Sequence, residues 1–152
     1  LRSGEKYPLA LIGDAPYGRT YIAELRKAAS SGNVVMPGAI YGTGYKELLS
    51  HALCYFHGTE VGGSHPALIE AMGAGTIVIA NDNPENREVL GDGGMLCPFT
   101  KVEMLADVIR AVASNPDNHR RYVPIAQQRV ADKYDWERIT SQYEELFDEF
   151  TR

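Results

Sequence analysis

The chain has 152 residues, of which 44% are hydrophobic and 23% charged, and its formal net charge is −5. This length allows one compact domain with a core of its own, and the apolar fraction excludes wholesale disorder. The acidic balance argues against a nucleic-acid-binding surface, because neutralising phosphates requires clustered Lys and Arg. No apolar run reaches the roughly 18 residues of a membrane-spanning helix, and no signal peptide is recognisable.

Short apolar runs bounded by Gly, Pro or Asp indicate strands, and apolar residues three and four apart indicate helices. In chain order, the expected elements are a strand at 8–13, a helix over 21–29, a strand at 34–36, a helix over 45–52, a strand at 53–56, a helix from 66 to 73 or 75, a strand at 76–80, a helix over 85–90, a strand at 95–97, and helices that begin near 100, 116 and 136. Thr100 and Glu103 have the spacing of a capping box, and Pro124 should kink or divide the helix that contains it.

Alternating strands and helices predict an α/β fold, a doubly wound parallel sheet with helices on both faces, and the last third adds a helical C-terminus. In such sheets ligands bind beyond the carboxyl ends of the strands. The loops that follow strands are therefore the places to look for a site, and "HGTEVGGSHP" at 57–66 is one of them.

This loop has the composition of an anion-binding site. Gly62, Gly63 and Ser64 precede a helix, and the backbone amides of such a segment can approach a phosphate closely. Glu60 stands before the glycines and Glu70 about one turn into the helix. Two carboxylates repel a phosphate but accept hydrogen bonds from hydroxyls, so the pattern favours a nucleotide sugar, which has hydroxyls on both sides of its diphosphate. A flexible loop followed by a helix with one exposed glutamate remains the alternative.

Other reactive side chains give weaker signals. His65 is a candidate contact of a phosphate or a sugar hydroxyl, or an ordinary loop histidine. The four histidines do not have the spacing of a metal site, so no metal is expected. Cys54 and Cys97 lie in short apolar runs and are expected to be free buried thiols.

The motifs "EAMGAGTIV" at 70–78 and "EVLGDGG" at 88–94 resemble the donor-binding half of retaining GT-B glycosyltransferases, in glycosyltransferase family four. The closing "YDWERITSQYEELF" resembles the family's C-terminal helix, and the "EVGG" with its following proline resembles a rhamnosyltransferase-like subgroup. Two departures stand out. Nine residues separate Glu60 from Glu70 where the family has seven, so either two residues are inserted or the sugar is held differently. The family's phosphate-binding Arg and Lys, in a G-R-x-x-x-E-K-G pattern, are not found.

The resemblance implies that residues 1–152 form a single Rossmann-like domain, the donor half of a two-domain enzyme whose first strand and acceptor domain are not in this sequence. This donor half alone should not catalyse the transfer. The intact enzyme would transfer a sugar from a nucleotide-sugar donor to a polysaccharide or lipid-linked acceptor, with retention of configuration and without a metal or other cofactor. A cytoplasmic location is implied, with peripheral contact to the inner face of the cell membrane left open.

The resemblance also implies residue roles. Glu60 would contact the donor sugar, Glu70 the ribose hydroxyls, and Gly62, Gly63, Ser64 and His65 the diphosphate region. The backbone of Gly38, Ala39 and Ile40 would hold the base. Two other classes remain open: a nucleotide-sugar epimerase or sugar-phosphate synthase of similar fold, and a non-catalytic α/β module that binds a protein partner.

Overall fold

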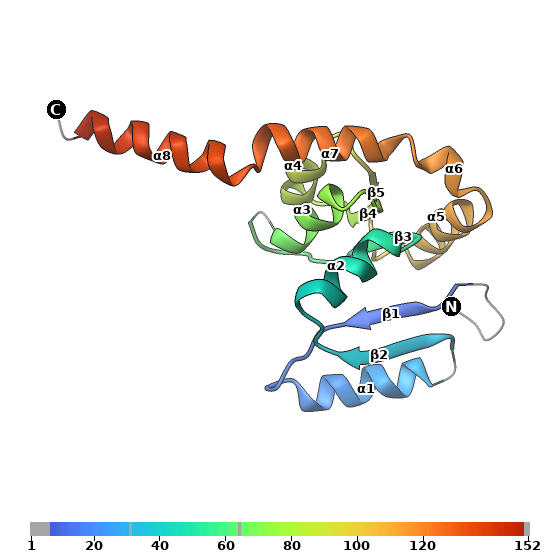
Figure 1. Cartoon of the computed structure of the whole chain (residues 1–152). Coiled ribbons are helices and arrows are strands. Elements are labelled where there is room, and N and C mark those ends of the chain that lie inside the picture. The colour runs from blue at the N-terminus through green and yellow to red at the C-terminus, as the bar shows by residue number, and fades with distance from the viewer. Residues whose placement is uncertain (1–6, 31, 64, 151–152) are drawn as a thin grey trace. The chain divides into compact units, whose positions relative to one another are not determined.

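The computed structural model describes residues 7–30, 32–63 and 65–150. The chain forms two compact units, Leu1–Glu47 and Leu48–Arg152, within each of which the residues mainly contact one another (Figure 1). No helix among the described residues is long and apolar enough to cross a membrane.

The first unit is a small β–α–β arrangement. Strands β1 (Leu9–Ile12) and β2 (Val34–Gly38) pair in parallel, and helix α1 (Arg19–Ala29) connects them and packs against β2. A parallel pair needs such a crossover, because a tight turn can join only antiparallel strands. Helix α2 (Gly42–His51) begins in this unit and ends in the second one.

The second unit is built on a parallel sheet of three strands. Its order is β3 (Cys54–His57), β4 (Ile77–Asn81) and β5 (Met95–Cys97), so β4 lies in the centre. Residues 77–80 of β4 are all buried, as expected for a strand covered on both faces. Ile77 and Ile79 pack with Cys97 and with Val112, which comes from helix α5 (Val102–Ser114).

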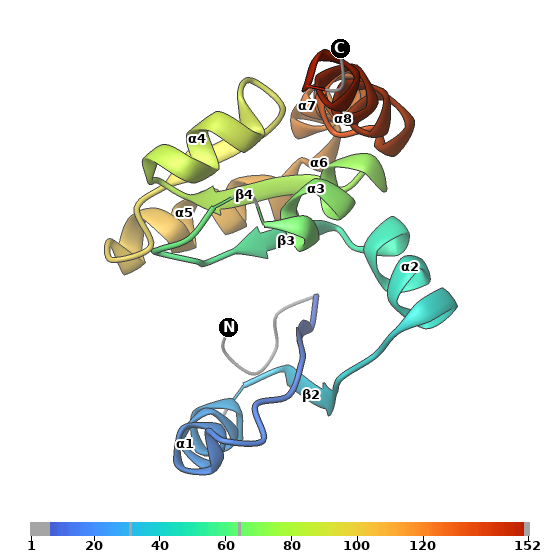
Figure 2. The same ribbon diagram turned by 90° about the vertical axis from the view of Figure 1, so that its left-hand side faces the viewer.

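Helices cover both faces of this sheet. Figures 1 and 2 show α3 (Pro66–Gly73) and α4 (Pro84–Leu90) on one face and α5 on the other. Two more helices, α6 (Pro116–His119) and α7 (Tyr122–Lys133), follow α5, and α7 runs alongside α3. Gln127 donates to the carbonyl of Gly73 at 3.3 Å, and Arg129 donates to the carbonyl of Val89 at 2.8 Å. The last helix, α8 (Trp136–Phe150), has no buried residue.

The parallel strands, the helices on both faces and the helical C-terminus confirm the predicted α/β fold class. Each predicted strand and helix is present, with ends that differ by a few residues. That residues 1–152 act as a single domain stays a prediction.

Two local predictions near the C-terminus are corrected. The capping box is wrong: α5 has Lys101 at its N-cap, with no side-chain hydrogen bond there. Pro124 does not divide its helix. The break at Arg120 and Arg121 precedes it, and Pro124 lies in the first turn of α7, where a missing N–H leaves no intrahelical bond unmade.

Candidate functional site

The loop between β3 and α3 carries most of the predicted site residues. It begins after His57, at the carboxyl end of β3, and α3 begins at Pro66. The side chain of Glu60 is exposed. Gly62 has a φ of +140°, and a Cβ there would lie 2.7 Å from Cε1 of His65. The loop therefore needs glycine at this position for both its backbone angle and its packing.

The helix that follows begins without a side-chain cap. His65 is the N-cap residue, with extended backbone angles, and Pro66 occupies the first turn. The amide of Leu68 donates to the carbonyl of His65 at 3.0 Å. The positive end of the helix dipole faces the glycine loop, which favours an anion there. Glu70 lies further along α3 with an exposed side chain.

Beneath the loop lies a small aromatic cluster of Tyr55, His57 and His65. His57 is only 6% exposed, and the centroid of its ring is 4.7 Å from that of His65. Nδ1 of His57 is 3.4 Å from the Tyr55 hydroxyl, whereas its buried Nε2 has no hydrogen-bond partner among the described residues. Burial, and then the nearby His65, lower the pKa of His57, so the neutral imidazole is favoured. Burial, and then the charge of Glu70, raise the pKa of Tyr55.

Three asparagines, at the end of β4 and the start of α4, hold the same loop. We call Asn81, Asn83 and Asn86 the asparagine clamp. Their Nδ2 groups converge on the backbone carbonyl of Thr59, at 3.4 Å, 2.9 Å and 3.3 Å respectively. Asn83 also donates to the carbonyl of Glu60 at 3.3 Å. The loop after β3 is thus fastened to the loop after β4 through side-chain amides.

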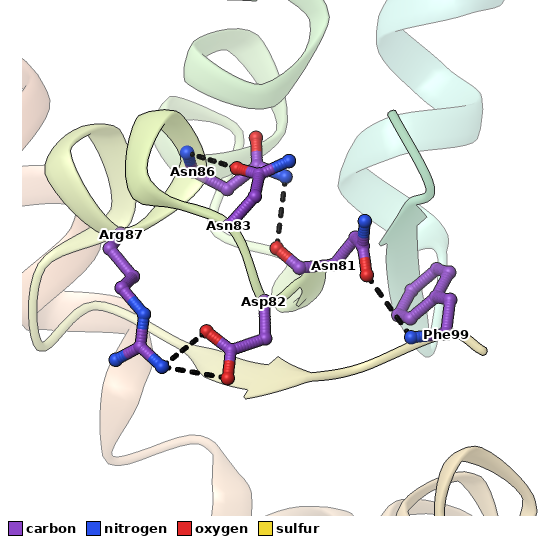
Figure 3. A network of polar contacts seen from close by, with 6 residues as sticks. All are labelled: Asn81, Asp82, Asn83, Asn86, Arg87 and Phe99. Carbon is purple, nitrogen blue, oxygen red and sulfur yellow. Dashed lines mark hydrogen bonds and ion pairs between the residues drawn. The ribbon is translucent and has the colours of Figure 1, made fainter. Parts of the chain in front are cut away.

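The clamp is itself fixed by further hydrogen bonds (Figure 3). Oδ1 of Asn83 accepts from the amide of Asn86 at 2.8 Å and so caps α4. Asn86 donates to the carbonyl of Asn81 at 3.0 Å, and Oδ1 of Asn81 accepts from the amide of Phe99 at 3.1 Å. Next to the clamp, Arg87 pairs with both carboxylate oxygens of Asp82, at 2.5 and 2.7 Å.

The predicted site residues fall into three groups. The second unit holds Glu60, Gly62, Gly63, His65 and Glu70, the last of these on α3 and the others in or at the end of the loop. Gly38, Ala39 and Ile40 belong to the first unit, where Gly38 ends β2 with a φ of +91° and its carbonyl accepts from the amide of Gly13 at 3.0 Å. Ser64 lies outside the described residues. Within the described residues, no three His, Cys, Asp or Glu side chains gather as a metal site would require.

Sequence reasoning pointed to the loops that follow strands in general but did not select the asparagines after β4 as part of the site. The usable signal was their density, with three asparagines within six residues directly after the most buried strand. Tyr55 was missed because it lies within a strand that reads as ordinary core.

Comparisons with known proteins point to a single family. Residues 1–129 match the family model described as glycosyl transferases group 1. A phosphatidyl-myo-inositol mannosyltransferase of Mycobacterium leprae is 39% identical over 83 residues, which cover 53% of this chain and 22% of that protein. The corresponding protein of Mycobacterium tuberculosis is 38% identical over 87 residues, or 53% of this chain and 23% of that protein. The matched segment thus spans less than a quarter of these relatives.

Solved structures show the same fold at low sequence identity. HepE of Anabaena in complex with UDP-glucose matches with a TM-score of 0.86 and 20% identity, over 97% of this chain and 42% of that one. Sucrose-phosphate synthase of Thermosynechococcus elongatus matches with a TM-score of 0.82 and 24% identity, over 94% of this chain and 38% of that one.

Proposed function

The chain belongs to the glycosyl transferases group 1, and we propose that it is the donor-binding half of a two-domain enzyme that transfers a sugar from a nucleotide sugar. The observation that carries this proposal is the loop at 58–65. It leaves the carboxyl end of a parallel strand, contains glycines, and leads into the N-terminus of α3, with exposed carboxylates at Glu60 and Glu70.

The proposed residue roles combine the chemistry of the loop with what the resemblance to family four implies. The amides of Gly62, Gly63 and Ser64, with the start of α3, stabilise the negative charge that develops on the leaving diphosphate. His65 adds a donor at the same place. Glu70 accepts hydrogen bonds from the ribose hydroxyls, and Glu60 accepts them from the sugar. We assign the base to backbone groups of Gly38, Ala39 and Ile40.

We propose transfer with retention of configuration and without a protein-bound metal, as the resemblance to family four implies. The donor sugar is a hexose. The "EVGG" variant favours rhamnose, whereas the relatives named above are mannosyltransferases. A polysaccharide or lipid-linked acceptor would be held by a part of the enzyme outside this chain. A cytoplasmic site of action, next to the inner face of the membrane for a lipid-linked acceptor, is part of the same proposal.

Two other functions are distinguishable. An epimerase or sugar-phosphate synthase of similar fold would also bind a nucleotide sugar, and product analysis separates it from a transferase. A protein-interaction module would ignore nucleotides altogether. Membership of a glycosyltransferase family favours the transferase over an epimerase and over an interaction module.

A thermal-shift panel tests the proposal. The full-length protein would be melted with UDP, GDP, ADP and dTDP, alongside Glu70→Ala and the control Glu145→Ala, which changes an exposed glutamate of α8. A ligand present at about a hundred times its dissociation constant adds about 2.7 kcal/mol to the free energy of unfolding. We expect a rise of several degrees with one nucleotide, retained in Glu145→Ala and reduced in Glu70→Ala. No rise with any of the four would refute a nucleotide-sugar enzyme.

A further inference from the structure

The asparagine clamp contains a buried polar group that stability alone does not explain. Asn86 is fully buried, and its Oδ1 has no hydrogen-bond partner in the part of the chain that the structure describes. A buried acceptor left without a donor is unfavourable, and an apolar side chain of similar shape would avoid this. What the asparagine provides is its Nδ2, which donates to Thr59 and to Asn81.

Asn83 is the central member of the clamp because all of its amide atoms are used. Its Oδ1 accepts from the amide of Asn86, which fixes the orientation of the side chain and turns Nδ2 toward the loop. Nδ2 then donates to two consecutive carbonyls, those of Thr59 at 2.9 Å and Glu60 at 3.3 Å. One side chain thus ties the start of α4 to the backbone of Glu60.

Three donors on one carbonyl exceed its two lone pairs, so the bonds to Thr59 are unequal. The bond from Asn83 is the short one, and those from Asn81 and Asn86 are longer. Asn81 and Asn86 therefore add weaker contacts to the carbonyl that Asn83 holds most closely. Phe99 packs against the preceding residue, since its ring lies 3.4 Å from the position of a Cβ on Gly58.

We propose that Asn83, supported by Asn81 and Asn86, is a positioning residue that holds the Glu60 backbone where its carboxylate meets the donor sugar. This inference rests on the proposed function. It also explains how the backbone that carries the Glu60 carboxylate is held on an irregular, exposed loop segment. Preorganisation of this kind matters because a displacement of about 1 Å in a positioned group can lower a rate a hundredfold.

The helix cap and the loop contacts of Asn83 can be separated by substitution. Asn83→Ser keeps an oxygen that can accept from the amide of Asn86. It removes the Nδ2 group and with it the two hydrogen bonds to the carbonyls of Thr59 and Glu60. Asn83→Asp keeps the cap as well, and places a negatively charged oxygen against the carbonyls of Thr59 and Glu60. Asn115→Ser is the matched control, because Asn115 caps α6 by accepting from the amide of Asn118 at 3.4 Å and donates no hydrogen bond to residues 58–63 or 65.

The experiment measures two quantities in the full-length protein. Hydrogen exchange reports on the backbone amides of residues 59–63. Calorimetry gives the dissociation constants of UDP, GDP and dTDP and of UDP-glucose, GDP-mannose and dTDP-rhamnose. The ratio between a nucleotide and its sugar conjugate measures what the sugar adds.

We expect these amides to exchange faster in both Asn83 variants. The gain in affinity that the sugar provides over the bare nucleotide should fall about tenfold, while the affinity for the bare nucleotide changes less than about threefold. Asn115→Ser should match the wild type in both measurements. Unchanged exchange would overturn the clamp, and faster exchange with an unchanged ratio would overturn its role toward the sugar. If the wild type binds no nucleotide at all, the proposed function itself fails, which is a different result from equal binding by wild type and variants.

Discussion

His65 packs over Gly62 so closely that a Cβ on the glycine would lie 2.7 Å from Cε1 of the imidazole. The same glycine has a φ of +140°, which side chains rarely adopt. Substitution by alanine therefore strains the backbone and displaces the His65 ring together.

The first prediction concerns this contact. Gly62→Ala should destabilise the protein by about 1–3 kcal/mol, and should weaken nucleotide-sugar binding because the loop must shift. Gly63→Ala is the control for stability, since a Cβ there would meet nothing within 4 Å and its φ is not positive. Urea unfolding of both variants checks the difference, and equal stability would contradict the described packing.

The second prediction is a pH dependence that originates at His57. Its pKa is lowered in the native state from an ordinary value of 6.5, so below that value the unfolded state binds more protons than the native state. The free energy of unfolding should therefore fall as the pH drops from 6.5 through the native pKa, and this contribution should be fully present above 6.5.

His57→Asn is the comparison for this measurement, because it cannot take up the proton. Urea unfolding of wild type and variant at about pH 7.5 and about pH 5.5 should show a larger loss of stability in the wild type. Parallel losses in the two proteins would assign the pH dependence to other groups.

The third prediction concerns the two thiols, both of which are free. Burial raises the pKa of the Cys54 thiol to about 11, and burial, followed by the charge of Asp82, raises that of Cys97. Because the thiolate is the reactive species, iodoacetamide at about pH 8 should modify the native protein far more slowly than the urea-unfolded protein. Mass spectrometry counts the labels, and rapid native labelling at Cys97, which is 1% exposed, would be inconsistent with its burial.

The fourth prediction concerns the close approach of Gly94 to the central strand. A Cβ on Gly94 would lie 2.7 Å from the carbonyl oxygen of Val78 in β4. Since backbone is less able to move than the end of a side chain, Gly94→Ala should destabilise the protein by about 1–3 kcal/mol. The melting temperature, compared with that of Gly63→Ala, provides the measurement, and a neutral effect would show that β4 and β5 can separate locally.

The elements of the fold were predictable because their signals are local. The apolar run at 76–80 predicts a buried strand, and Pro66 followed by Gly73 and Gly75 predicts the ends of a helix. The structure places β4 at Ile77–Asn81 and α3 at Pro66–Gly73. The capping box failed because the local pattern does not determine which residue becomes the N-cap. Helix α5 begins one residue later than a Thr100 N-cap would require.

The density of asparagines at 81–86 could have marked this loop, but the contacts of the asparagine clamp were not predictable from local signals. Asn83 and Thr59 are 24 residues apart, and an amide that donates to a distant carbonyl has no periodicity to reveal it. The contact between Tyr55 and His57 was also missed. The two residues lie on one face of β3, but the sequence suggests core packing for Tyr55 and the start of a loop for His57. Glu60 and Glu70 were selected from sequence, and their assignment to sugar and ribose stays a prediction.

The central claim is that Glu70 binds the ribose hydroxyls of a nucleotide-sugar donor. It is tested most directly by a thermodynamic cycle that combines a substitution in the protein with a change in the ligand. Calorimetry would compare the preferred nucleoside diphosphate with its 2′,3′-dideoxy analogue, in wild type and in Glu70→Ala. We expect the wild type to prefer the nucleotide with ribose hydroxyls by about tenfold or more, since hydrogen bonds to a charged acceptor are worth about 1.5–3 kcal/mol, and the variant to bind both alike. An undiminished preference in Glu70→Ala would contradict the ribose role and, with it, the donor site described here.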